Sequence, residues 1–260
     1  MYKTGLILIL LLILTGCGVN VNISKPTLDV NVEQIDISAN FPLINKTIYN
    51  SNFTEQTLKV YFINVSQGDS ELIIFPDNTT MLIDAGKESY GYIVLGLLNK
   101  LNITELNYCL VSHNHEDHYG GFKIVGFMCE KNQTYDGTHG FNIYPKENYS
   151  NENDNSIITK ITYKNISFLF TGDCASECEE EIIKYNISAN ILKVSHHGSK
   201  TSTSDEFLDK VNPSISIIEV GKNSYGHPTS ETLERLKNTK IYRTDLDGTI
   251  LIETDGNKIK

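Results

Sequence analysis

The sequence predicts an α/β fold with two β-sheets that are covered by helices. Three short apolar stretches open the regular part of the chain, at 58–65, 71–75 and 80–83, and each has the length and residue types of a strand. From about residue 90 onward, helical and strand patterns alternate. Strands first, followed by strand–helix alternation, indicate two sheets with helices packed against them.

Turn residues separate the early strands, with Gly68 after the first and a Pro-Asp-Asn sequence at 76–78 after the second. A helix with one apolar face is expected at 90–101 and a strand at 106–112. The later expected elements are a hairpin at 156–163 and 166–170, a helix at 175–185, a strand at 190–194, a helix that is capped by Thr203 and Glu206 and ends at Val211, a strand at 214–220, a helix at 230–238, and strands at 240–243 and 249–253.

The first 17 residues have the features of a secretory signal. Lys3 precedes an apolar run at 6–14, which is shorter than the roughly 20 residues that span a bilayer. The Leu-Thr-Gly-Cys sequence that ends at Cys17 resembles a lipobox, in which the cysteine receives a lipid. Residues 18–55, rich in Asn, Ser, Thr and Ile, are expected to form a low-complexity tether, and 56–260 the main domain. We therefore expect an extracytoplasmic protein, anchored to the cell membrane through lipid on Cys17 or through an uncleaved N-terminal segment.

Composition limits the classes of partner. The formal net charge is −10, and a basic stripe of the kind that binds long nucleic acids is absent from the sequence. No protein partner is indicated.

Four cysteines follow Cys17: Cys109, Cys129, Cys174 and Cys178. In an exported chain they allow two disulfides, with three possible pairings that the spacing does not distinguish.

One segment, 111–121, carries most of the chemistry and is called the histidine loop below. It follows an apolar run that predicts a buried strand, and it contains His113, His115, Asp117 and His118 within six residues. Alternate residues of an extended loop point the same way, so the first two histidines are expected side by side. Imidazole and carboxylate groups suit zinc and related metals. A polar loop with scattered histidines is the alternative, but it does not account for this density of ligands.

Other loops at expected strand ends also carry polar residues next to glycine. A strand that ends in Asp or His at a glycine turn fixes a ligand on a rigid element. These loops are Gln67-Gly68-Asp69, Asp84-Ala85-Gly86, Thr171-Gly172-Asp173, His196-His197-Gly198-Ser199 and Gly226-His227-Pro228.

With the His-X-His-X-Asp-His pattern of the histidine loop and Asn153-Asp154-Asn155-Ser156, these loops resemble the metallo-β-lactamase superfamily. The branch they resemble is typified by the β-lactamase-like domain of the DNA-uptake competence protein ComEC. The resemblance covers about 58–253 and identifies 56–260 as a metallo-β-lactamase-like hydrolase domain. It implies a four-layer αββα sandwich with a metal site at the sheet edges.

The resemblance also implies roles for individual residues. Two divalent cations are expected, zinc by preference and manganese as the alternative. His113 and His115 would hold one ion, and Asp117, His118 and His196 would hold the other. Asp173 would bridge the two ions, and Asp84 would hydrogen-bond the histidine loop. His197 and His227 would contact substrate phosphate or donate a proton. The region between Gly121 and Asn153 is shorter than in the family, and His139 within it is either a further ligand of the first ion or a solvated loop histidine.

The reaction that this site implies is hydrolysis of a phosphodiester by a hydroxide that bridges two metals, with Asp117, Asp173, His197 and His227 as the catalytic residues. Candidate substrates are DNA, short oligonucleotides or a small phosphodiester. An acyl hydrolase of lactones, amides or thioesters is a second hypothesis, because one fold hosts many reactions. A lipoprotein that binds a metal or ligand without turnover is a third. Phosphate chemistry is expected to need Lys200, Lys222 or His227, whereas acyl chemistry is not.

Overall fold

Two six-stranded sheets form the framework of the computed structural model, which describes residues 46–47, 56–130, 140–143 and 149–259. All of them lie within one compact unit, Ile37–Lys260. The first sheet consists, in spatial order, of β1 (Lys46–Thr47), β12 (Ile250–Thr254), β2 (Leu58–Phe62), β3 (Glu71–Ile74), β4 (Thr80–Ile83) and β5 (Tyr108–Leu110). The second consists of β11 (Lys240–Arg243), β10 (Ile215–Ile218), β9 (Ile191–Lys193), β8 (Ile166–Phe170), β7 (Ile158–Tyr163) and β6 (Gly140–Ile143).

The direction of the strands decides where their ends meet. In the first sheet, β2, β3 and β4 form an antiparallel meander and β5 runs parallel to β4. In the second, β8, β9, β10 and β11 are all parallel. Because parallel strands end at the same edge of a sheet, the loops that follow β4 and β5 lie together, and so do those that follow β8, β9 and β10.

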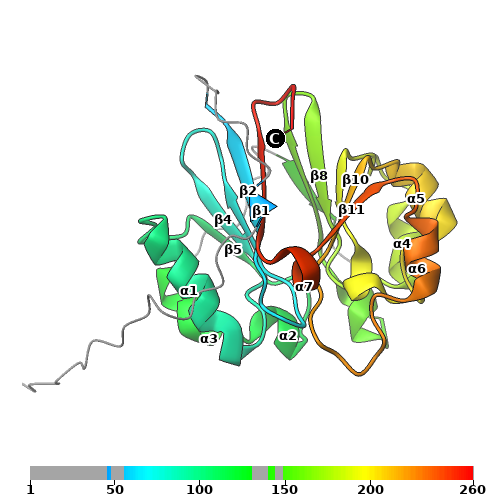
Figure 1. Ribbon diagram of the computed structural model, residues 1–260, viewed down its shortest axis with the longest axis horizontal. Helices are drawn as coiled ribbons and strands as arrows, with labels where there is room; N and C mark the ends of the chain where they lie inside the picture. Colours follow the sequence, from blue (N-terminus) through cyan, green and yellow to red (C-terminus); the bar gives the residue numbers. More distant parts are fainter. Residues whose placement is uncertain (1–45, 48–55, 131–139, 144–148, 260) are drawn as a thin grey trace, which may run out of the picture. The chain divides into compact units, whose positions relative to one another are not determined.

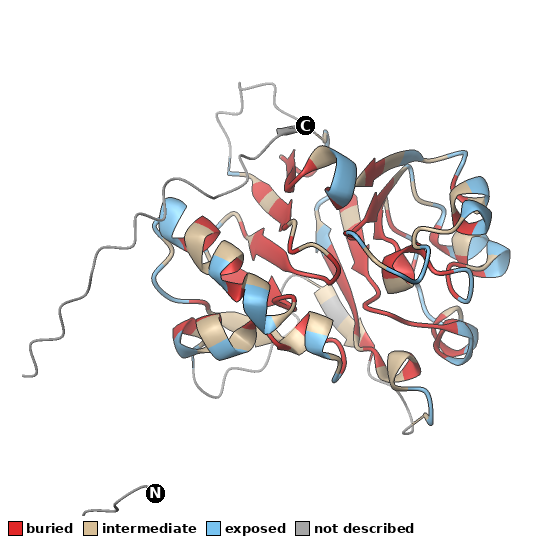
Figure 2. Ribbon diagram, turned by 60° about the horizontal axis from the view of Figure 1, so that its bottom comes forward, coloured by how far each residue is buried: buried red, intermediate tan, exposed pale blue. Residues whose placement is uncertain are grey.

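Helices cover the outer face of each sheet, as Figure 1 shows. The first sheet packs against α1 (Gly91–Lys100) and α3 (Phe122–Val125), and the second against α4 (Ser176–Ile182), α5 (Asp205–Val211) and α6 (Ser230–Arg235). Apolar side chains of both sheets, such as Phe62 and Phe170 with ring centroids 6.0 Å apart, fill the space between them. In Figure 2 the strands are almost entirely buried, and the helices expose their outer sides. The expected four-layer αββα sandwich is confirmed.

The histidine loop is more structured than expected. It contains α2 (Glu116–Tyr119), and α3 and the short helix η3 (Gly126–Met128) follow it directly. His115 has an extended backbone before α2, and its carbonyl accepts from the His118 N–H at 3.0 Å. Four-residue helices are too short to show a 3.6-residue periodicity, so the sequence pattern did not predict them.

The expected cap of α5 is wrong. Ser204 caps this helix, and its hydroxyl accepts from the Phe207 N–H at 3.2 Å. Thr203 has a φ of +58°, and its N–H donates to the carboxylate of Glu179 instead. The remaining short helices are η2 (Glu88–Tyr90), η4 (Glu152–Asn155), η5 (Ser195–Gly198) and α7 (Thr244–Asp247).

Both disulfides that the composition allowed are present. Cys109 on β5 pairs with Cys129, which follows η3, and Cys174 pairs with Cys178 on α4. None of the helices in the described ranges combines the length and the hydrophobicity that crossing a membrane requires.

One buried ammonium group joins the two sheets. Lys193, at the end of β9, is 0% exposed, and its Nζ donates to the carboxylate of Asp69, which lies between β2 and β3 of the other sheet. The same Nζ donates to the carbonyl of Gly172 at 2.9 Å. Burial alone would lower the pKa of Lys193, but Asp69 and the other carboxylates around it raise the pKa above its ordinary value. These other carboxylates are Asp173, Glu71 and Glu219, and burial raises the pKa of the two glutamates.

We expect Lys193→Met to lower the free energy of unfolding by about 3–5 kcal/mol, because it leaves the Asp69 carboxylate buried without its partner. Urea unfolding followed by circular dichroism measures this. Lys240→Met, at an exposed position on β11 of the same sheet, is the matched control and should change little. Equal effects of the two substitutions would show that the ammonium does not stabilise the fold.

Candidate metal centre

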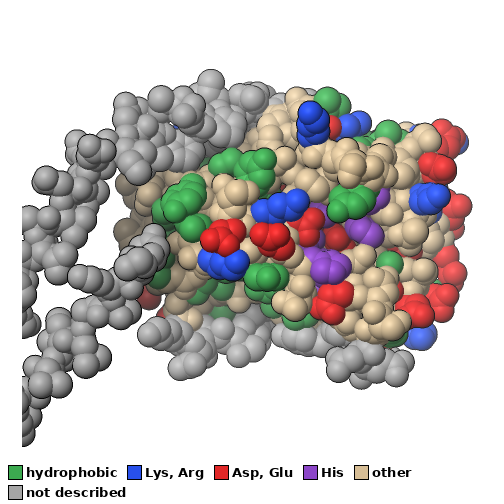
Figure 3. Space-filling model, turned by 90° about the horizontal axis from the view of Figure 1, so that it is seen from below, with side chains coloured by type: hydrophobic (Ala, Val, Ile, Leu, Met, Phe, Trp, Pro, Cys, Tyr) green, Lys and Arg blue, Asp and Glu red, His purple; other side chains and the backbone are tan. Residues whose placement is uncertain are grey.

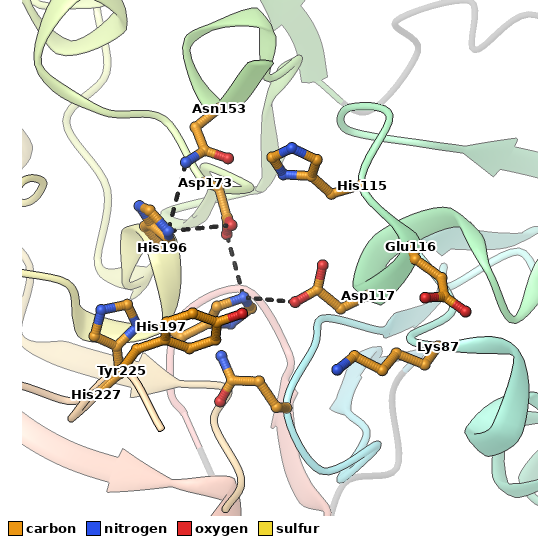
Figure 4. Close-up of a pocket in the computed structure, with 11 residues that line it drawn as sticks. Lys87, His115, Glu116, Asp117, Asn153, Asp173, His196, His197, Tyr225 and His227 are labelled. Carbon is orange, nitrogen blue, oxygen red and sulfur yellow. Dashed lines mark hydrogen bonds and ion pairs between the residues drawn. The ribbon is translucent and has the colours of Figure 1, made fainter. Parts of the chain in front are cut away.

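Polar side chains gather where strands of both sheets end on one face of the molecule. Asp84 follows β4 and the histidine loop follows β5, both in the first sheet. Asp173 follows β8 and η5 follows β9, both in the second sheet. Figure 3, which views this face, shows histidine and acidic side chains next to one another. In Figure 4 the side chains of His115, Asp117, Asp173 and His197 point toward a common space.

Asp117, His118 and His197 form one group of converging ligand atoms. His197 Nε2 lies 3.7 Å from Asp117 Oδ2 and 3.5 Å from Asp173 Oδ1. His118 Nε2 lies 3.3 Å from the same oxygen of Asp173. Both Nε2 atoms and this oxygen are buried, and within the described part of the chain they have no hydrogen-bond partner. Because buried polar atoms without a partner cost free energy, the arrangement fits a cation that all of them would bind.

The other ring nitrogen of each histidine is held by an acceptor. His118 Nδ1 lies 2.7 Å from Asp84 Oδ2. His197 Nδ1 lies 2.9 Å from the carbonyl oxygen of Glu219 and 3.2 Å from Asp69 Oδ1. A proton on Nδ1 satisfies these acceptors and leaves the Nε2 lone pair for a metal. The two rings are therefore oriented as metal ligands are.

Asp84 also fixes the backbone of the histidine loop. Its Oδ1 accepts from the Ser112 N–H at 2.7 Å, and its Oδ2 accepts from the Ser112 hydroxyl at 2.6 Å. The carboxylate thus ties the start of the loop to the ring of His118, and these are the contacts that the sequence analysis assigned to it.

His113, His115 and Asp173 form a second group. His113 Nε2 lies 2.9 Å from His115 Nδ1 and 3.9 Å from Asp173 Oδ2. Asp173 thus directs Oδ2 toward His113 and Oδ1 toward His118 and His197. His139, the other candidate for this group, lies outside the described residues.

Two adjacent histidines differ from expectation in their positions. His197, not His196, lies with Asp117 and His118. His196 Nε2 lies 3.8 Å from Asp173 Oδ2 and 3.5 Å from Asn153 Nδ2, nearer the surface. Both histidines have φ values near +50°, in the left-handed region that non-glycine residues rarely adopt. This turn directs His197 between the sheets, where it is 2% exposed, and a sequence motif does not reveal which of two neighbouring side chains is directed inward.

The charges around the site match a cation. Burial opposes a positive charge on His118, but the carboxylates of Asp173, Asp84 and Asp69 outweigh it and raise the pKa of this histidine well above its ordinary value. In contrast, burial and the neighbouring His118 lower the pKa of His113 to about 3. The centre therefore combines neutral imidazole with an excess of carboxylate, which is the environment that a divalent cation requires.

A pocket of about 360 Å³ opens from these groups to the surface. Of the three residues that the sequence analysis named for phosphate binding, His227 lines this pocket, whereas Lys200 and Lys222 are exposed outside it. Lys87 lines it instead, and Figure 4 shows it on the side opposite His196 and His227. The sequence analysis missed Lys87, although it directly follows the Asp84-Ala85-Gly86 motif. Burial and the neighbouring His196 lower the pKa of His227 to about 4, so its ring is neutral at pH 7.

Two glycines allow the loops to approach closely. A Cβ on Gly68 would lie 2.4 Å from the carbonyl oxygen of Asp117, and the Asp69 N–H donates to this oxygen at 3.1 Å. A Cβ on Gly198 would lie 2.6 Å from Pro228 Cβ. Glycine at these positions thus brings the 67–69 loop against the histidine loop, and His227 against η5.

Comparison with known proteins places the chain near competence proteins. No protein-family model matches it. ComE operon protein 3 of Bacillus subtilis is 39% identical over 106 residues, which are 39% of this chain and 14% of that protein. Competence protein ComA of Neisseria gonorrhoeae is 28% identical over 200 residues, which are 66% of this chain and 29% of that protein. The chain therefore matches less than a third of the length of either relative. These matches confirm the expected resemblance to ComEC-type competence proteins.

A solved structure of Tm1679, described as a metal-dependent hydrolase of the β-lactamase superfamily, is similar with a TM-score of 0.49 and 14% identity. The similarity covers 72% of this chain and 96% of that chain.

We expect Asp84→Asn to weaken zinc binding by about 10- to 100-fold, because an amide holds the Nδ1 proton of His118 less strongly than a carboxylate does. Competition with a fluorescent zinc indicator measures the affinity. Glu105→Gln, which changes an exposed carboxylate before β5 in the same way, should bind zinc as the wild type does. Unchanged affinity in Asp84→Asn would rule out this orienting role.

Proposed function

We propose that this chain, which resembles the ComEC-type competence proteins, is a metal-dependent hydrolase that cleaves phosphodiesters at a site for two divalent cations. The observation that carries the proposal is the convergence of His118 Nε2, His197 Nε2 and Asp173 Oδ1. All three atoms are buried and have no hydrogen-bond partner within the described ranges. Such a donor set suits zinc, with manganese as the alternative.

The proposed ligands follow the two geometric groups. We assign Asp173 to both, because it belongs to the first group and its Oδ1 lies 3.3 Å from His118 Nε2 and 3.5 Å from His197 Nε2 of the other. Divalent cations bound there would lower the pKa of a coordinated water and stabilise the negative charge that builds up on phosphate oxygens. The ligands of one ion would be His113, His115 and Asp173, and those of the other Asp117, His118, His197 and Asp173. His197 thus replaces His196 as the ligand of the second ion in this proposal.

The residues at the mouth of the pocket would bind the substrate. Lys87 places a positive charge across the pocket from His196 and His227, where it would pair with a phosphate oxygen. Asn153 and His196 lie on the other wall and offer hydrogen bonds. His227 is neutral at pH 7, so we assign it a hydrogen bond to the substrate rather than an ion pair. A lysine at this position favours an anionic phosphodiester over an uncharged acyl substrate.

We propose the location from the sequence. The signal-like segment 1–17 and most of the expected tether 18–55 lie outside the described residues. In this proposal the domain at 56–260 works outside the cytoplasm, held at the membrane through Cys17 or an uncleaved segment. The relatives are named for competence, which favours DNA or a short oligonucleotide as the substrate.

We expect the full chain, stripped of metal and reloaded with zinc or manganese, to hydrolyse bis-p-nitrophenyl phosphate. Asp117→Ala should lower kcat/KM at least 100-fold, because it removes a ligand of the second ion. Two metals bound per chain, with hydrolysis of a lactone or thioester but of no phosphodiester, would establish the acyl hydrolase instead. One metal or none, with no turnover, would favour the binding lipoprotein.

We expect Lys87→Ala to raise KM for the phosphodiester about tenfold, because it removes one charge-assisted hydrogen bond to the substrate. A tenfold change in KM corresponds to about 1.4 kcal/mol. Steady-state kinetics of the zinc-loaded chain measure this. Lys222→Ala, which removes an exposed lysine from outside the pocket, should leave KM unchanged. The reverse result would mean that Lys222 binds the substrate and Lys87 does not.

A further inference from the structure

Two hollows meet at one exposed tyrosine. The pocket of the metal centre has a volume of about 360 Å³, and a second hollow of about 320 Å³ lies beside it. Tyr225 and His227 line both of them. The second hollow is otherwise lined by Ser199, Lys200, Thr201, Gly226, Thr229, Ser230 and Glu231. A ligand that fills both must therefore pass over Tyr225.

Tyr225 presents an open aromatic face at this junction. Its side chain is 72% exposed, and its ring lies 5.7 Å from the ring of His227 at an interplanar angle of 32°. In Figure 4 the tyrosine ring lies beside His227 and in front of His197. One face of the ring is thus turned toward His227 and the remainder is available to a ligand. A single exposed aromatic residue is ordinary on a protein surface, so it is the position of Tyr225 between the two hollows, and not its exposure, that points to a ligand.

The loop beneath Tyr225 is held in place by a single side chain. Asn223 Oδ1 accepts from the N–H groups of Tyr225 and His227, at 3.0 and 3.1 Å. Asn223 Nδ2 donates to the carbonyls of Gly221 and His227, both at 2.9 Å. Because the backbone is already ordered, a ligand that stacks on the ring does not have to order it, and this lowers the entropic cost of binding.

The chemistry of the two hollows indicates what would bind. A phosphodiester held by the metal centre has an ester substituent on each side, and one of them would extend over Tyr225. Flat aromatic bases stack on tyrosine, and such stacking accepts every base. In the second hollow Lys200 and nearby hydroxyls suit one further phosphate, whereas Glu231, which accepts from the Ser230 hydroxyl at 3.2 Å, disfavours more negative charge. The net charge of −10 also disfavours a long polyanion.

We infer that Tyr225 is a stacking platform for the nucleobase next to the scissile phosphate of a short single-stranded oligonucleotide, and that the second hollow receives the following nucleotide. This inference rests on the proposed phosphodiesterase function and narrows its substrate class.

The test compares two substrates of equal length and charge on the zinc-loaded full chain. One is a deoxythymidine tetranucleotide, and the other has the same backbone with abasic sites. We expect the wild type to prefer the tetranucleotide with bases about tenfold in kcat/KM. Tyr225→Ala should bring this ratio close to one, mainly through KM, and Tyr225→Phe should retain it because the ring remains. Tyr92→Ala, at a 60% exposed tyrosine on α1, should keep the wild-type ratio.

A separate substitution tests the role of the second hollow. Lys200→Ala should raise KM for the tetranucleotide severalfold, because it removes the charge that would pair with the further phosphate. An unchanged KM would overturn the assignment of the second hollow to the following nucleotide. Lys240→Ala, on β11 away from both hollows, is the control.

The outcomes separate the inference from the function on which it rests. Turnover of phosphodiesters with no preference for bases, or with a preference that survives in Tyr225→Ala, would overturn the inference alone. Absence of turnover on every phosphodiester, including bis-p-nitrophenyl phosphate, would overturn the proposed function and the inference with it.

Discussion

The buried contact between Lys193 and Asp69 sets the geometry of the candidate site. The ammonium on β9 binds a carboxylate of the first sheet, and it also binds the carbonyl of Gly172, which precedes Asp173. Asp69 in turn contacts His197 through its side chain and the carbonyl of Asp117 through its N–H. One cation therefore positions ligand-bearing loops from both sheets. Apolar packing brings the sheets together, and this polar contact joins the loops at their edges, together with the hydrogen bond from the Ser70 N–H to Glu219.

Much of the fold could be predicted because the periodicity of the strands is strong. The stretches at 58–65, 71–75 and 80–83 contain β2, β3 and β4, and the four layers follow from strands that precede alternating helices. The short elements were missed for a physical reason. A four-residue helix such as α2 depends on tertiary contacts, and its own residue pattern is too short to be informative.

The candidate site also has features that the sequence predicts and features that it does not. The dense motif of the histidine loop, with Asp84 and Asp173, was apparent from residue types and spacing, and the structure brings these residues together. The sequence did not reveal whether His196 or His197 points toward Asp117 and His118, because two consecutive residues in the left-handed conformation decide this. Lys87 was missed for a different reason. Its place in the pocket comes from the turn after β4, and a single lysine next to a motif carries no signal in a sequence.

The position of β12 has a consequence for how the chain reaches this structure. This last strand lies between β1 and β2, so that Ile250 pairs with Phe62 on one side and with Lys46 on the other. The first sheet is therefore complete only after residues 250–254 have become available. Pairing of residues so far apart in sequence makes folding slow, since a long loop must close before the contacts form. During synthesis, β1 and β2 must therefore remain without this partner until about two hundred further residues have been added.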